Sequence, residues 1–383
     1  MGILGTGQLG RMLALAARRM GVRVITHGDD AEHSPCGQVA EPVADLDTFL
    51  RRADVVTTEF ENVEVAVLAA AKLARPSGQL VGICQNRGRE KAFLRAEGLP
   101  TVPHQLLDMA SGSSGSGSSG SALGASGSSL RQAIVDFGLP AVLKTAAFGY
   151  DGKGQWVLRD RADLDELDGI PAHAGPFVVE SLVDLALELS VVVARGGNGE
   201  AVCYPVIENR HRHHILDVSL APAGVDAELA GRAQKLALQI AEALTAVGVL
   251  CVEFFVTTSG ELLVNEIAPR PHNSGHLTIE AAPSSQFDQQ LRAVCGLPLG
   301  AVAPFRPAAM ANLLGELWAQ GEPNWAHALA VPGVTLHLYG KDNPRPGRKM
   351  GHLTAVASTP HEALELVLDA RQRLGSRPAP PSG

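Results

Sequence analysis

The stretch Leu250–His276 constrains the fold of this chain more than any other, because it predicts two strands joined by a short loop. The runs 250–256 and 261–267 are rich in apolar and β-branched residues, and the residues between them include a glycine. This pattern is typical of a β-hairpin. If the loop pairs Val256 with Glu261, residue 253 lies opposite residue 264 across the hairpin.

Two acidic residues lie close together in this predicted hairpin. Side chains alternate between the faces of a strand, so the pairing above puts Glu253 and Glu266 diagonally on one face. Two adjacent carboxylates in an apolar hairpin repel one another and are costly to bury unless a cation joins them. Mg²⁺ prefers a few hard oxygen ligands, and Asn265 adds a neutral oxygen. We therefore predict a magnesium site here; two acids on a solvated face are the alternative.

The composition is that of a globular protein with several domains. The chain has 383 residues, of which 45% are hydrophobic and 19% charged, and its formal net charge is -8. This length predicts two or three domains, and the negative charge argues against nucleic acid or an anionic membrane as a partner. No apolar run approaches the roughly 18 residues of a membrane span, and we expect no secretory signal. Five scattered cysteines predict free thiols in a reducing cytoplasm.

The N-terminal region predicts a β–turn–α–β unit. Gly5–Gly10 has the pattern G-x-G-x-x-G, follows a short strand and opens a helical pattern. A further buried strand at 54–58 brings Glu59 to the carboxyl edge of the sheet, where ligands bind in open α/β sheets. A nicotinamide-dependent oxidoreductase is the alternative that this motif supports, but such an enzyme leaves the acidic hairpin unexplained.

A glycine-rich segment, Gly149–Gln155, lies between two predicted strands and just after Lys144. Closely spaced glycines let backbone N–H groups approach phosphate oxygens, and the lysine supplies positive charge. The segment lacks the G-K-[ST] ending of a Walker A motif, and no helical pattern follows it. We predict a flap over nucleotide phosphates; an ordinary glycine-rich hairpin is the alternative.

Two further groups of basic residues suit anionic ligands. Arg270 and His272 follow the acidic hairpin and suit a planar oxyanion, with a helix-capping surface loop as the alternative. Lys341 and Arg348 belong to a basic loop at 341–352, which predicts a phosphate-bearing substrate; a solvated basic turn is the alternative. The histidines of 210–214 lack the partners of a structural zinc site.

Low-complexity segments mark the connections. Residues 111–129 are almost entirely serine and glycine, and we expect a flexible surface loop there. The proline-rich tail from Arg377 is expected to be disordered. We divide the chain at 1–97, 98–300 and 301–383.

Five stretches together resemble the ATP-grasp enzymes and, within them, the N5-carboxyaminoimidazole ribonucleotide synthases. They are Gly5–Leu13, Glu59–Val63, Phe148–Gln155, Asn265–His276 and Arg345–His352. The resemblance runs nearly end to end; the serine/glycine segment is longer than the family usually carries, and the N-terminus begins a few residues late. It implies an α/β and α+β multidomain fold. A Rossmann-like pre-ATP-grasp domain is followed by an ATP-grasp domain with a small lid and by a small, β-rich C-terminal domain.

The resemblance also implies roles for individual residues. The residues that would contact ATP are Arg87, Lys144, Gly149, Tyr150, Asp151, Gly152, Lys153, Gly154, Gln155, Glu180, Ser181, Leu182, Val183, Glu188, His211, Asn265 and Glu266. Glu253 and Glu266 would bind magnesium. The residues that would hold the ribonucleotide are Gln8, Leu9, Glu59, Tyr150, Asp151, Lys341 and Arg348. Arg270 and His272 would bind bicarbonate or the CO₂ derived from it, and with Lys144 they are the expected catalytic residues.

The implied reaction is an ATP- and bicarbonate-dependent carboxylation of 5-aminoimidazole ribonucleotide through carboxyphosphate, in purine biosynthesis. ATP and Mg²⁺, for which Mn²⁺ can substitute, are the implied cofactors, and a cytoplasmic homodimer is the implied state. Another ATP-grasp ligase, such as the formate-dependent glycinamide ribonucleotide transformylase, is the alternative within the superfamily. Biotin carboxylase is disfavoured because no biotin carrier segment is visible. A catalytically inactive nucleotide-binding regulator is the remaining alternative.

Overall fold

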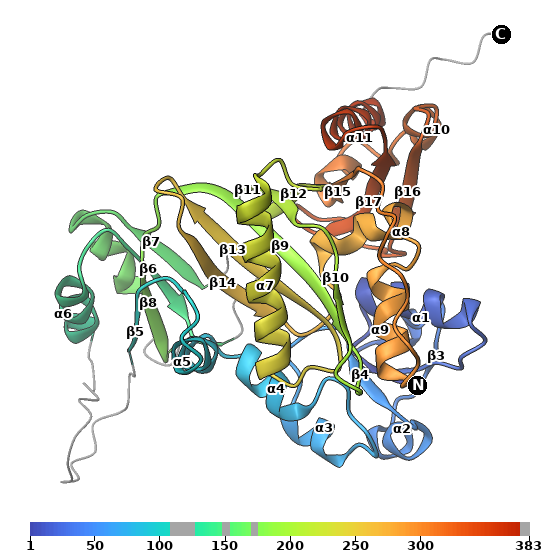
Figure 1. Ribbon diagram of the computed structural model, residues 1–383, viewed down its shortest axis with the longest axis horizontal. Helices are drawn as coiled ribbons and strands as arrows, with labels where there is room; N and C mark the ends of the chain where they lie inside the picture. Colours follow the sequence, from blue (N-terminus) through green and yellow to red (C-terminus); the bar gives the residue numbers. More distant parts are fainter. Residues whose placement is uncertain (108–126, 148–153, 170–174, 376–383) are drawn as a thin grey trace. The chain divides into compact units, whose positions relative to one another are not determined.

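The structure is a computed structural model that describes residues 1–107, 127–147, 154–169 and 175–375 (Figure 1). The chain forms two compact units, and each is built from separate stretches of sequence. The first unit comprises Met1–Val81, Leu187–Glu253 and Ile267–Gly383, and the second comprises Gly82–Ala186 and Phe254–Glu266. No helix in the described ranges is long and apolar enough to cross a membrane.

The first unit begins with a four-stranded parallel sheet in the order β3-β2-β1-β4. In this sheet Leu4 lies between His27 and Thr58, so the predicted Rossmann-like β–α–β arrangement is confirmed. The elements are β1 (Gly2–Leu4), α1 (Gln8–Arg19), β2 (Ile25–His27), the 3₁₀ turn η1 (Ala31–His33), β3 (Glu41–Pro42), α2 (Leu46–Arg52), β4 (Val56–Thr58), α3 (Val65–Ala70) and α4 (Gly78–Cys84), whose last residues belong to the second unit.

Helix α1 follows from a one-sided apolar pattern. Met12, Leu13, Ala16 and Ala17 are buried and recur at helical spacing, so they form one apolar stripe. This stripe packs on α9, which carries Phe287 and Leu291 into the same core. The packing holds the start of α1 at the carboxyl edge of the parallel sheet.

A large, mainly antiparallel sheet follows, in the order β14-β13-β9-β11-β12-β15-β17-β16, with β10 beside β9. Its apolar core includes Val192, Ile207 and Met310. The elements of this part of the chain are β9 (Leu185–Arg195), β10 (Ala201–Cys203), β11 (Ile207–Arg212), β12 (Ile215–Ala221), α7 (Ala227–Ala243), β13 (Gly248–Thr257), β14 (Leu262–Ala268), η4 (Asn273–Leu277), α8 (Thr278–Ala281) and α9 (Gln286–Val294).

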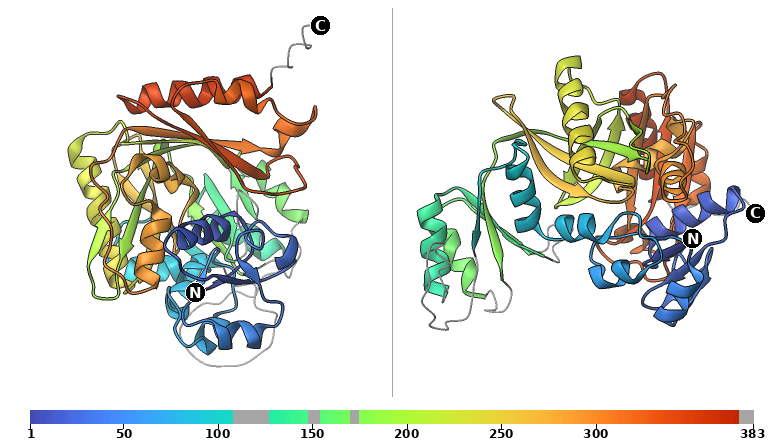
Figure 2. Two further views of the ribbon diagram at one scale, coloured as in Figure 1. Left: turned by 90° about the vertical axis from the view of Figure 1, so that its right-hand side faces the viewer. Right: turned by 60° about the horizontal axis from the view of Figure 1, so that its bottom comes forward.

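The C-terminal part extends this sheet and covers it with a helix. Its elements are β15 (Ala308–Leu314), η5 (Gly315–Trp318), α10 (Trp325–Leu329), β16 (Val334–Leu338), β17 (Lys349–Val356) and α11 (Pro360–Leu374). Thr359 caps α11 by accepting the N–H of Glu362, and Pro360 fits the first helical position. Leu364 and Val367 then pack on β15 and β17, so α11 lies along the strands (Figure 2).

The second unit contains an antiparallel sheet in the order β5-β8-β6-β7. Its elements are α5 (Arg87–Ala96), β5 (His104–Leu107), α6 (Gly127–Phe137), β6 (Ala141–Thr145), β7 (Gln155–Leu158), the 3₁₀ segment η2 (Ala162–Gly169) and β8 (Phe177–Ser181). Leu130 and Ile134 of α6 pack against Leu143 and Phe177. Helix α6 begins inside the segment expected to be a loop, because these two apolar residues at i,i+4 anchor it; the rest of that segment and the tail from 376 lie outside the described residues.

The predicted hairpin is present, but its loop is one residue shorter than expected. The N–H of Thr257 donates to the carbonyl of Glu261 at 3.0 Å, so these residues close the hairpin rather than Val256 and Glu261. Gly260 has φ +84°, a left-handed conformation that glycine adopts without strain. The regular alternation of burial along β14 is broken at Asn265 and Glu266, which are both partly exposed.

No disulfide joins the five cysteines, all of which lie in the described part of the chain. Cys36, Cys84 and Cys251 are buried, whereas Cys203 and Cys295 are half-buried.

Candidate active site

A cluster of charged side chains lies buried in the second unit. Lys144 on β6 and Glu180 on β8 share one face of the sheet, and the Lys144 Nζ lies 2.6 Å from the Glu180 Oε2. The Nζ of Lys91 on α5 approaches the other oxygen of this carboxylate at 3.5 Å. All three side chains are less than 10% exposed. Two ammonium groups and one carboxylate leave an excess of positive charge here.

The electrostatics of this cluster keep Glu180 ionised. Burial alone would raise the pKa of its carboxyl, but Lys144, Lys91 and Arg87 outweigh that effect and lower the pKa to about 2. Burial lowers the pKa of the Lys144 ammonium, and Glu180 opposes this shift. The cluster can therefore present a cation to an anionic group such as a phosphate.

Arg87, in the first turn of α5, reaches the end of the hairpin. Its Nη1 lies 3.0 Å from the Oε2 of Glu266. The adjacent Asn265 has a buried Oδ1 with no hydrogen-bond partner, and its backbone carbonyl accepts from Lys91 at 3.1 Å. Arg87 and Lys91 are four residues apart, so they lie on one face of α5.

In the first unit, polar side chains share one face of strands β9, β11 and β12. Glu188 lies opposite Asn209, and His211 is two residues further along the same face. The Nδ1 of His211 lies 2.8 Å from the Oε2 of Glu188. Burial would lower the pKa of His211, but this carboxylate outweighs burial and raises it.

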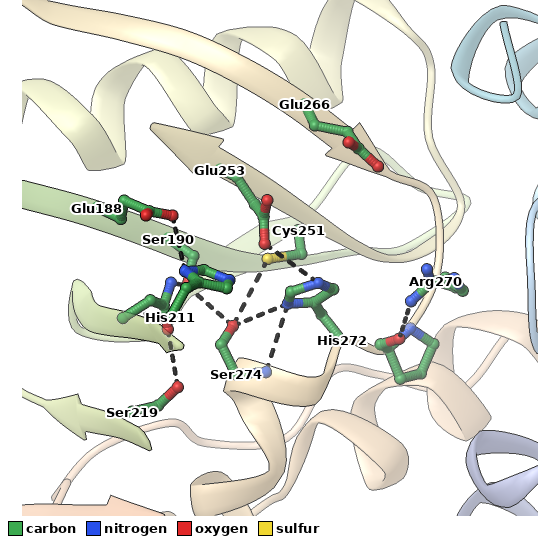
Figure 3. A network of polar contacts seen from close by, with 12 residues as sticks. Glu188, Ser190, His211, Ser219, Cys251, Glu253, Glu266, Arg270, His272 and Ser274 are labelled. Carbon is green, nitrogen blue, oxygen red and sulfur yellow. Dashed lines mark hydrogen bonds and ion pairs between the residues drawn. The ribbon is translucent and has the colours of Figure 1, made fainter. Parts of the chain in front are cut away.

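Arg270 and His272 lie beside this face, and each is held by a carboxylate. Figure 3 shows the one that contacts His272. Glu61 accepts from the Nε of Arg270 and from its Nη2, the latter at 3.0 Å, so the plane of the guanidinium is fixed. The Nε2 of His272 lies 3.3 Å from the Oε1 of Glu253. Burial, and then Arg270, lowers the pKa of His272 well below its ordinary value, so this ring is neutral at pH 7.

The G-x-G-x-x-G turn binds a carboxylate of the protein itself. Glu59 accepts from the backbone N–H of Gly7 and, at 2.8 Å, from that of Gly10. A Cβ at Gly7 would lie 2.7 Å from the Glu59 Oε1, so glycine is needed here for the close approach of this side chain. Because Glu59 occupies the N-terminus of α1, the motif is accounted for without the pyrophosphate of a nicotinamide cofactor.

Lys341 lies near Glu59, whereas Arg348 makes its described contact within its own loop. Burial raises the pKa of Glu59, and Arg270 and Lys341 lie close enough to oppose that shift. The Nζ of Lys341 donates to the carbonyl of Lys349 at 2.7 Å. The Nη1 of Arg348 donates to the carbonyl of Asn343 at 2.7 Å.

Three known domain families match successive parts of this chain. A ribonucleotide synthetase preATP-grasp domain matches residues 1–85, an ATP-grasp domain matches 120–287, and a phosphoribosylaminoimidazole carboxylase C-terminal domain matches 308–366. The chain is 39% identical over 378 residues to an N5-carboxyaminoimidazole ribonucleotide synthase of Bacillus subtilis (strain 168), covering 95% of this chain and 93% of that protein. The chain belongs to the N5-carboxyaminoimidazole ribonucleotide synthase family. The predicted resemblance is thereby confirmed.

Other members of the synthase family agree in sequence and fold. A synthase of Brucella melitensis is 39% identical over 93% of this chain and 96% of its own length. The ADP complex of an N5-carboxyaminoimidazole ribonucleotide synthetase superposes with a TM-score of 0.84, at 38% identity, over 97% of this chain and 95% of that one. An Aspergillus clavatus N5-carboxyaminoimidazole synthase solved with ADP and 5-aminoimidazole ribonucleotide has a TM-score of 0.82, at 30% identity, over 97% of each chain. The predicted fold class is confirmed.

Some residues expected to bind ligands of the synthase family have no described geometry or no described role. Of the predicted flap, Gly149–Lys153 lie outside the described residues, and only Gly154 and Gln155 are described. Gln155 lies opposite Lys144 in the sheet. Gln8 and Leu9 open α1. Ser181 ends β8, Leu182 and Val183 follow it, and all three are half-buried.

Sequence reasoning missed three residues that complete these clusters. Lys91 pairs with Glu180, Glu61 pairs with Arg270, and the Ser274 Oγ lies 2.9 Å from the His272 Nδ1. A signal existed for Lys91, which lies four residues after Arg87 on one helical face. Glu61 is two residues after Glu59 but gave no signal of its partner, because Arg270 lies 209 residues away.

The residues around Glu266 offer the type of ligand atom that a divalent cation such as Mg²⁺ prefers. Oxygen is the only donor type that Glu253, Glu266 and Asn265 offer, and the Oδ1 of Asn265 is buried without a partner. No group of three or more His, Cys, Asp or Glu residues suited to a metal ion occurs in the described part of the chain. Glu253 belongs to the first unit and Glu266 to the second.

Proposed function

We propose that this protein catalyses the ATP- and bicarbonate-dependent carboxylation of 5-aminoimidazole ribonucleotide to N5-carboxyaminoimidazole ribonucleotide. The observation that carries the proposal is the end-to-end relationship to synthases of that name, including the carboxylase C-terminal domain at 308–366. A related synthase was solved with ADP and the aminoimidazole ribonucleotide together, which supports both ligands. The relatives described above give no support to the transformylase alternative.

The buried cluster of the second unit would bind the phosphates of ATP. Lys144 and Arg87 would neutralise charge as the γ-phosphoryl group moves to bicarbonate, giving carboxyphosphate and ADP. Glu180 holds Lys144 in place, because their 2.6 Å contact is buried. In the first unit, Glu188 would accept from the ribose hydroxyls, and His211 would contact the nucleotide.

The polar face of the first unit would hold the carbon that is transferred. Arg270, with its plane fixed by Glu61, would bind the planar oxyanion of bicarbonate, and His272 would add a second donor. After carboxyphosphate releases phosphate, the exocyclic amine of the ribonucleotide attacks the resulting CO₂ and forms the carbamate. Lys341, Arg348, Glu59 and the start of α1 would hold the ribonucleotide itself.

Glu253 and Glu266 would hold Mg²⁺, for which Mn²⁺ can substitute. The donor set supports this assignment, because hard oxygen ligands are the ones that Mg²⁺ prefers. When bound, the ion would neutralise charge on the triphosphate. Arg87, which pairs with Glu266, would help to neutralise the charge of the same triphosphate.

The deciding experiment measures phosphate release from MgATP and bicarbonate with and without 5-aminoimidazole ribonucleotide. Strong stimulation by this ribonucleotide, with formation of an acid-labile carbamate, is the expected result. Stimulation by glycinamide ribonucleotide and formate instead would move the assignment to the transformylase. Nucleotide binding without any turnover would indicate an inactive regulator.

We further propose that the protein works as a homodimer in the cytoplasm. Five cysteines without a disulfide suit a reducing compartment. Light scattering after size-exclusion chromatography should give about twice the 40.0 kDa mass of one chain. A mass of one chain at working concentrations would contradict the dimer.

A further inference from the structure

A continuous chain of buried hydrogen bonds runs from strand β12 to His272 (Figure 3). The Ser219 hydroxyl is 2.7 Å from the Asn209 Oδ1, and the Asn209 Nδ2 is 2.9 Å from the Ser190 Oγ. The Ser190 and Ser274 hydroxyl oxygens are 2.9 Å apart, and the Ser274 Oγ is 2.9 Å from the His272 Nδ1. The three serines are fully buried, and Asn209 is 5% exposed.

The contacts of the two ring nitrogens of His272 determine which group donates in each of these hydrogen bonds. The Glu253 carboxylate, which is 3.3 Å from Nε2, can only accept, so Nε2 carries the hydrogen. On the other side the backbone N–H of Ser274 points at Nδ1 from 3.4 Å, which requires a lone pair there. A neutral ring has one N–H and one lone pair, so both contacts select the same tautomer.

The direction then propagates through every member. The Ser274 hydroxyl donates to Nδ1, so its oxygen accepts from the Ser190 hydroxyl. The Ser190 oxygen in turn accepts from the amide N–H of Asn209, whose carbonyl oxygen accepts from Ser219. Each hydroxyl thus donates once, and no donor faces another donor. In the opposite tautomer Nδ1 would donate to the Ser274 oxygen, and the Ser274 hydroxyl would donate to Ser190. The Ser190 oxygen would then accept from both Ser274 and the Asn209 amide, and its own hydrogen would have no acceptor in this network.

We propose that Ser274, Ser190 and Asn209 are positioning residues that hold His272 as the Nε2–H tautomer, with this N–H directed to the face that carries Glu253. In this tautomer His272 donates a hydrogen bond to the oxyanion of bicarbonate or carboxyphosphate, an assignment that rests on the proposed function. The Nε2 atom has no lone pair for a proton, so His272 is not the base that deprotonates the attacking amine.

The test is ¹⁵N NMR of protein with labelled histidine, with the His272 signals assigned by their loss in His272→Gln. The expected result is a protonated Nε2 and an unprotonated Nδ1 that accepts a hydrogen bond. In Ser274→Ala the Nδ1 signal should move toward that of an unbonded nitrogen, and kcat should fall by roughly 10-fold while the KM for ATP stays unchanged. Asn209→Asp, whose carboxylate can only accept from Ser190, should shift the population toward Nδ1–H.

Ser34→Ala is the matched control, because Ser34 is a buried serine with two hydrogen bonds outside this chain. It should leave the His272 signals unchanged. If Ser274→Ala does not fold, Ser190→Ala tests the same link one residue further away. A wild-type Nδ1–H tautomer, or unchanged His272 signals in Ser274→Ala and Asn209→Asp, would overturn the inference.

The two proposals fail in different ways. A wild-type protein that shows the Nε2–H tautomer but forms no carbamate would refute the proposed function, whereas the positioning role of Ser274, Ser190 and Asn209 would remain supported. A protein that forms the carbamate with an Nδ1–H tautomer refutes only the positioning chain.

Discussion

At the scale of single residues, Glu180 is the carboxylate on which the charges of the second unit converge. Lys144 and Lys91 approach its two oxygens, and none of the three side chains is appreciably exposed. A buried carboxylate keeps its charge only where cations and hydrogen bonds replace the lost hydration. The charged states of Glu180 and of its two lysines therefore depend on one another.

Glu180 should make the stability of the second unit depend on acid pH. Its folded pKa of about 2 lies below the ordinary value of 4.5, so the ionised carboxylate stabilises the folded state above about pH 4.5. This stability, about 3 kcal/mol by linkage, is lost as the pH falls toward 2. Urea unfolding followed by Trp156 fluorescence, with Trp318 and Trp325 replaced by phenylalanine, should show it.

Glu180→Gln should remove this dependence and should also destabilise the unit at neutral pH, because two buried ammonium groups lose their counter-ion. Glu166→Gln, at an exposed position of the same unit, is the control and should behave as wild type. An unchanged acid limb in Glu180→Gln would show that another group carries the dependence.

Lys341 tests the ribonucleotide site at the same scale. Lys341→Ala should raise the KM for aminoimidazole ribonucleotide by roughly 10- to 100-fold, because hydrogen bonds to charged groups contribute about 1.5–3 kcal/mol. The KM for ATP should change far less. Steady-state kinetics with each substrate varied in turn measures both, and Lys235→Ala, on the exposed side of α7, is the control. An unchanged KM for the ribonucleotide would remove Lys341 from that site.

At the scale of elements, three strands of the large sheet carry the polar face of the first unit, because alternate residues of a strand share one face. Glu188 and Ser190 of β9, Asn209 and His211 of β11, and Ser219 of β12 all lie on the same face. This face needs no long loop to assemble, since the strands fix the spacing of the side chains.

Two glycines in neighbouring elements should respond to alanine in opposite ways. Gly231 is exposed on α7 with nothing within 4 Å of an added Cβ, so Gly231→Ala should stabilise the protein by about 0.5–1 kcal/mol. Gly248, at the start of β13, has φ +128° and would place a Cβ 2.8 Å from the Oε1 of Gln290. Gly248→Ala should therefore destabilise it by about 1–3 kcal/mol. Thermal unfolding measures both; equal shifts would contradict the argument.

At the scale of the whole molecule, the chain crosses between its two units four times. The crossings fall within α4, β9, β13 and β14, so each lies inside a helix or strand. The second unit is consequently discontinuous in sequence. The hairpin residues 254–266 complete it, because the Thr101 Oγ1 donates to the Val264 carbonyl at 2.9 Å and Arg87 pairs with Glu266.

A fragment of residues 82–186 should therefore fail to unfold cooperatively. Without 254–266, Lys91 loses one of its acceptors, the Asn265 carbonyl, and Arg87 loses its partner Glu266. The same fragment joined to 254–266 by a short glycine-rich linker is the control and should regain a sigmoidal urea transition. Equal cooperativity of the two fragments would show that the hairpin is dispensable for this unit.

The sequence by itself determined the local conformations and the chemical types at the site. Runs rich in apolar and β-branched residues predicted β13 and β14, and the glycine pattern predicted the turn before α1. Lys144 and Arg270 were chosen for their charge. These features depend on neighbouring residues, whose backbone preferences and side-chain directions can be inferred from the sequence. The predicted loop of the hairpin was one residue too long, because a left-handed glycine such as Gly260 changes the closing pair without changing the sequence pattern.

Only the tertiary structure decided which charges and hydrogen bonds are paired. Glu61 meets Arg270 across 209 residues, and Ser190 meets Ser274 across 84. Such pairs form because separate elements pack on common cores, and no local pattern encodes the partner. For the same reason the sequence did not reveal that the Glu59 carboxylate accepts from the backbone of the glycine turn at the N-terminus of α1.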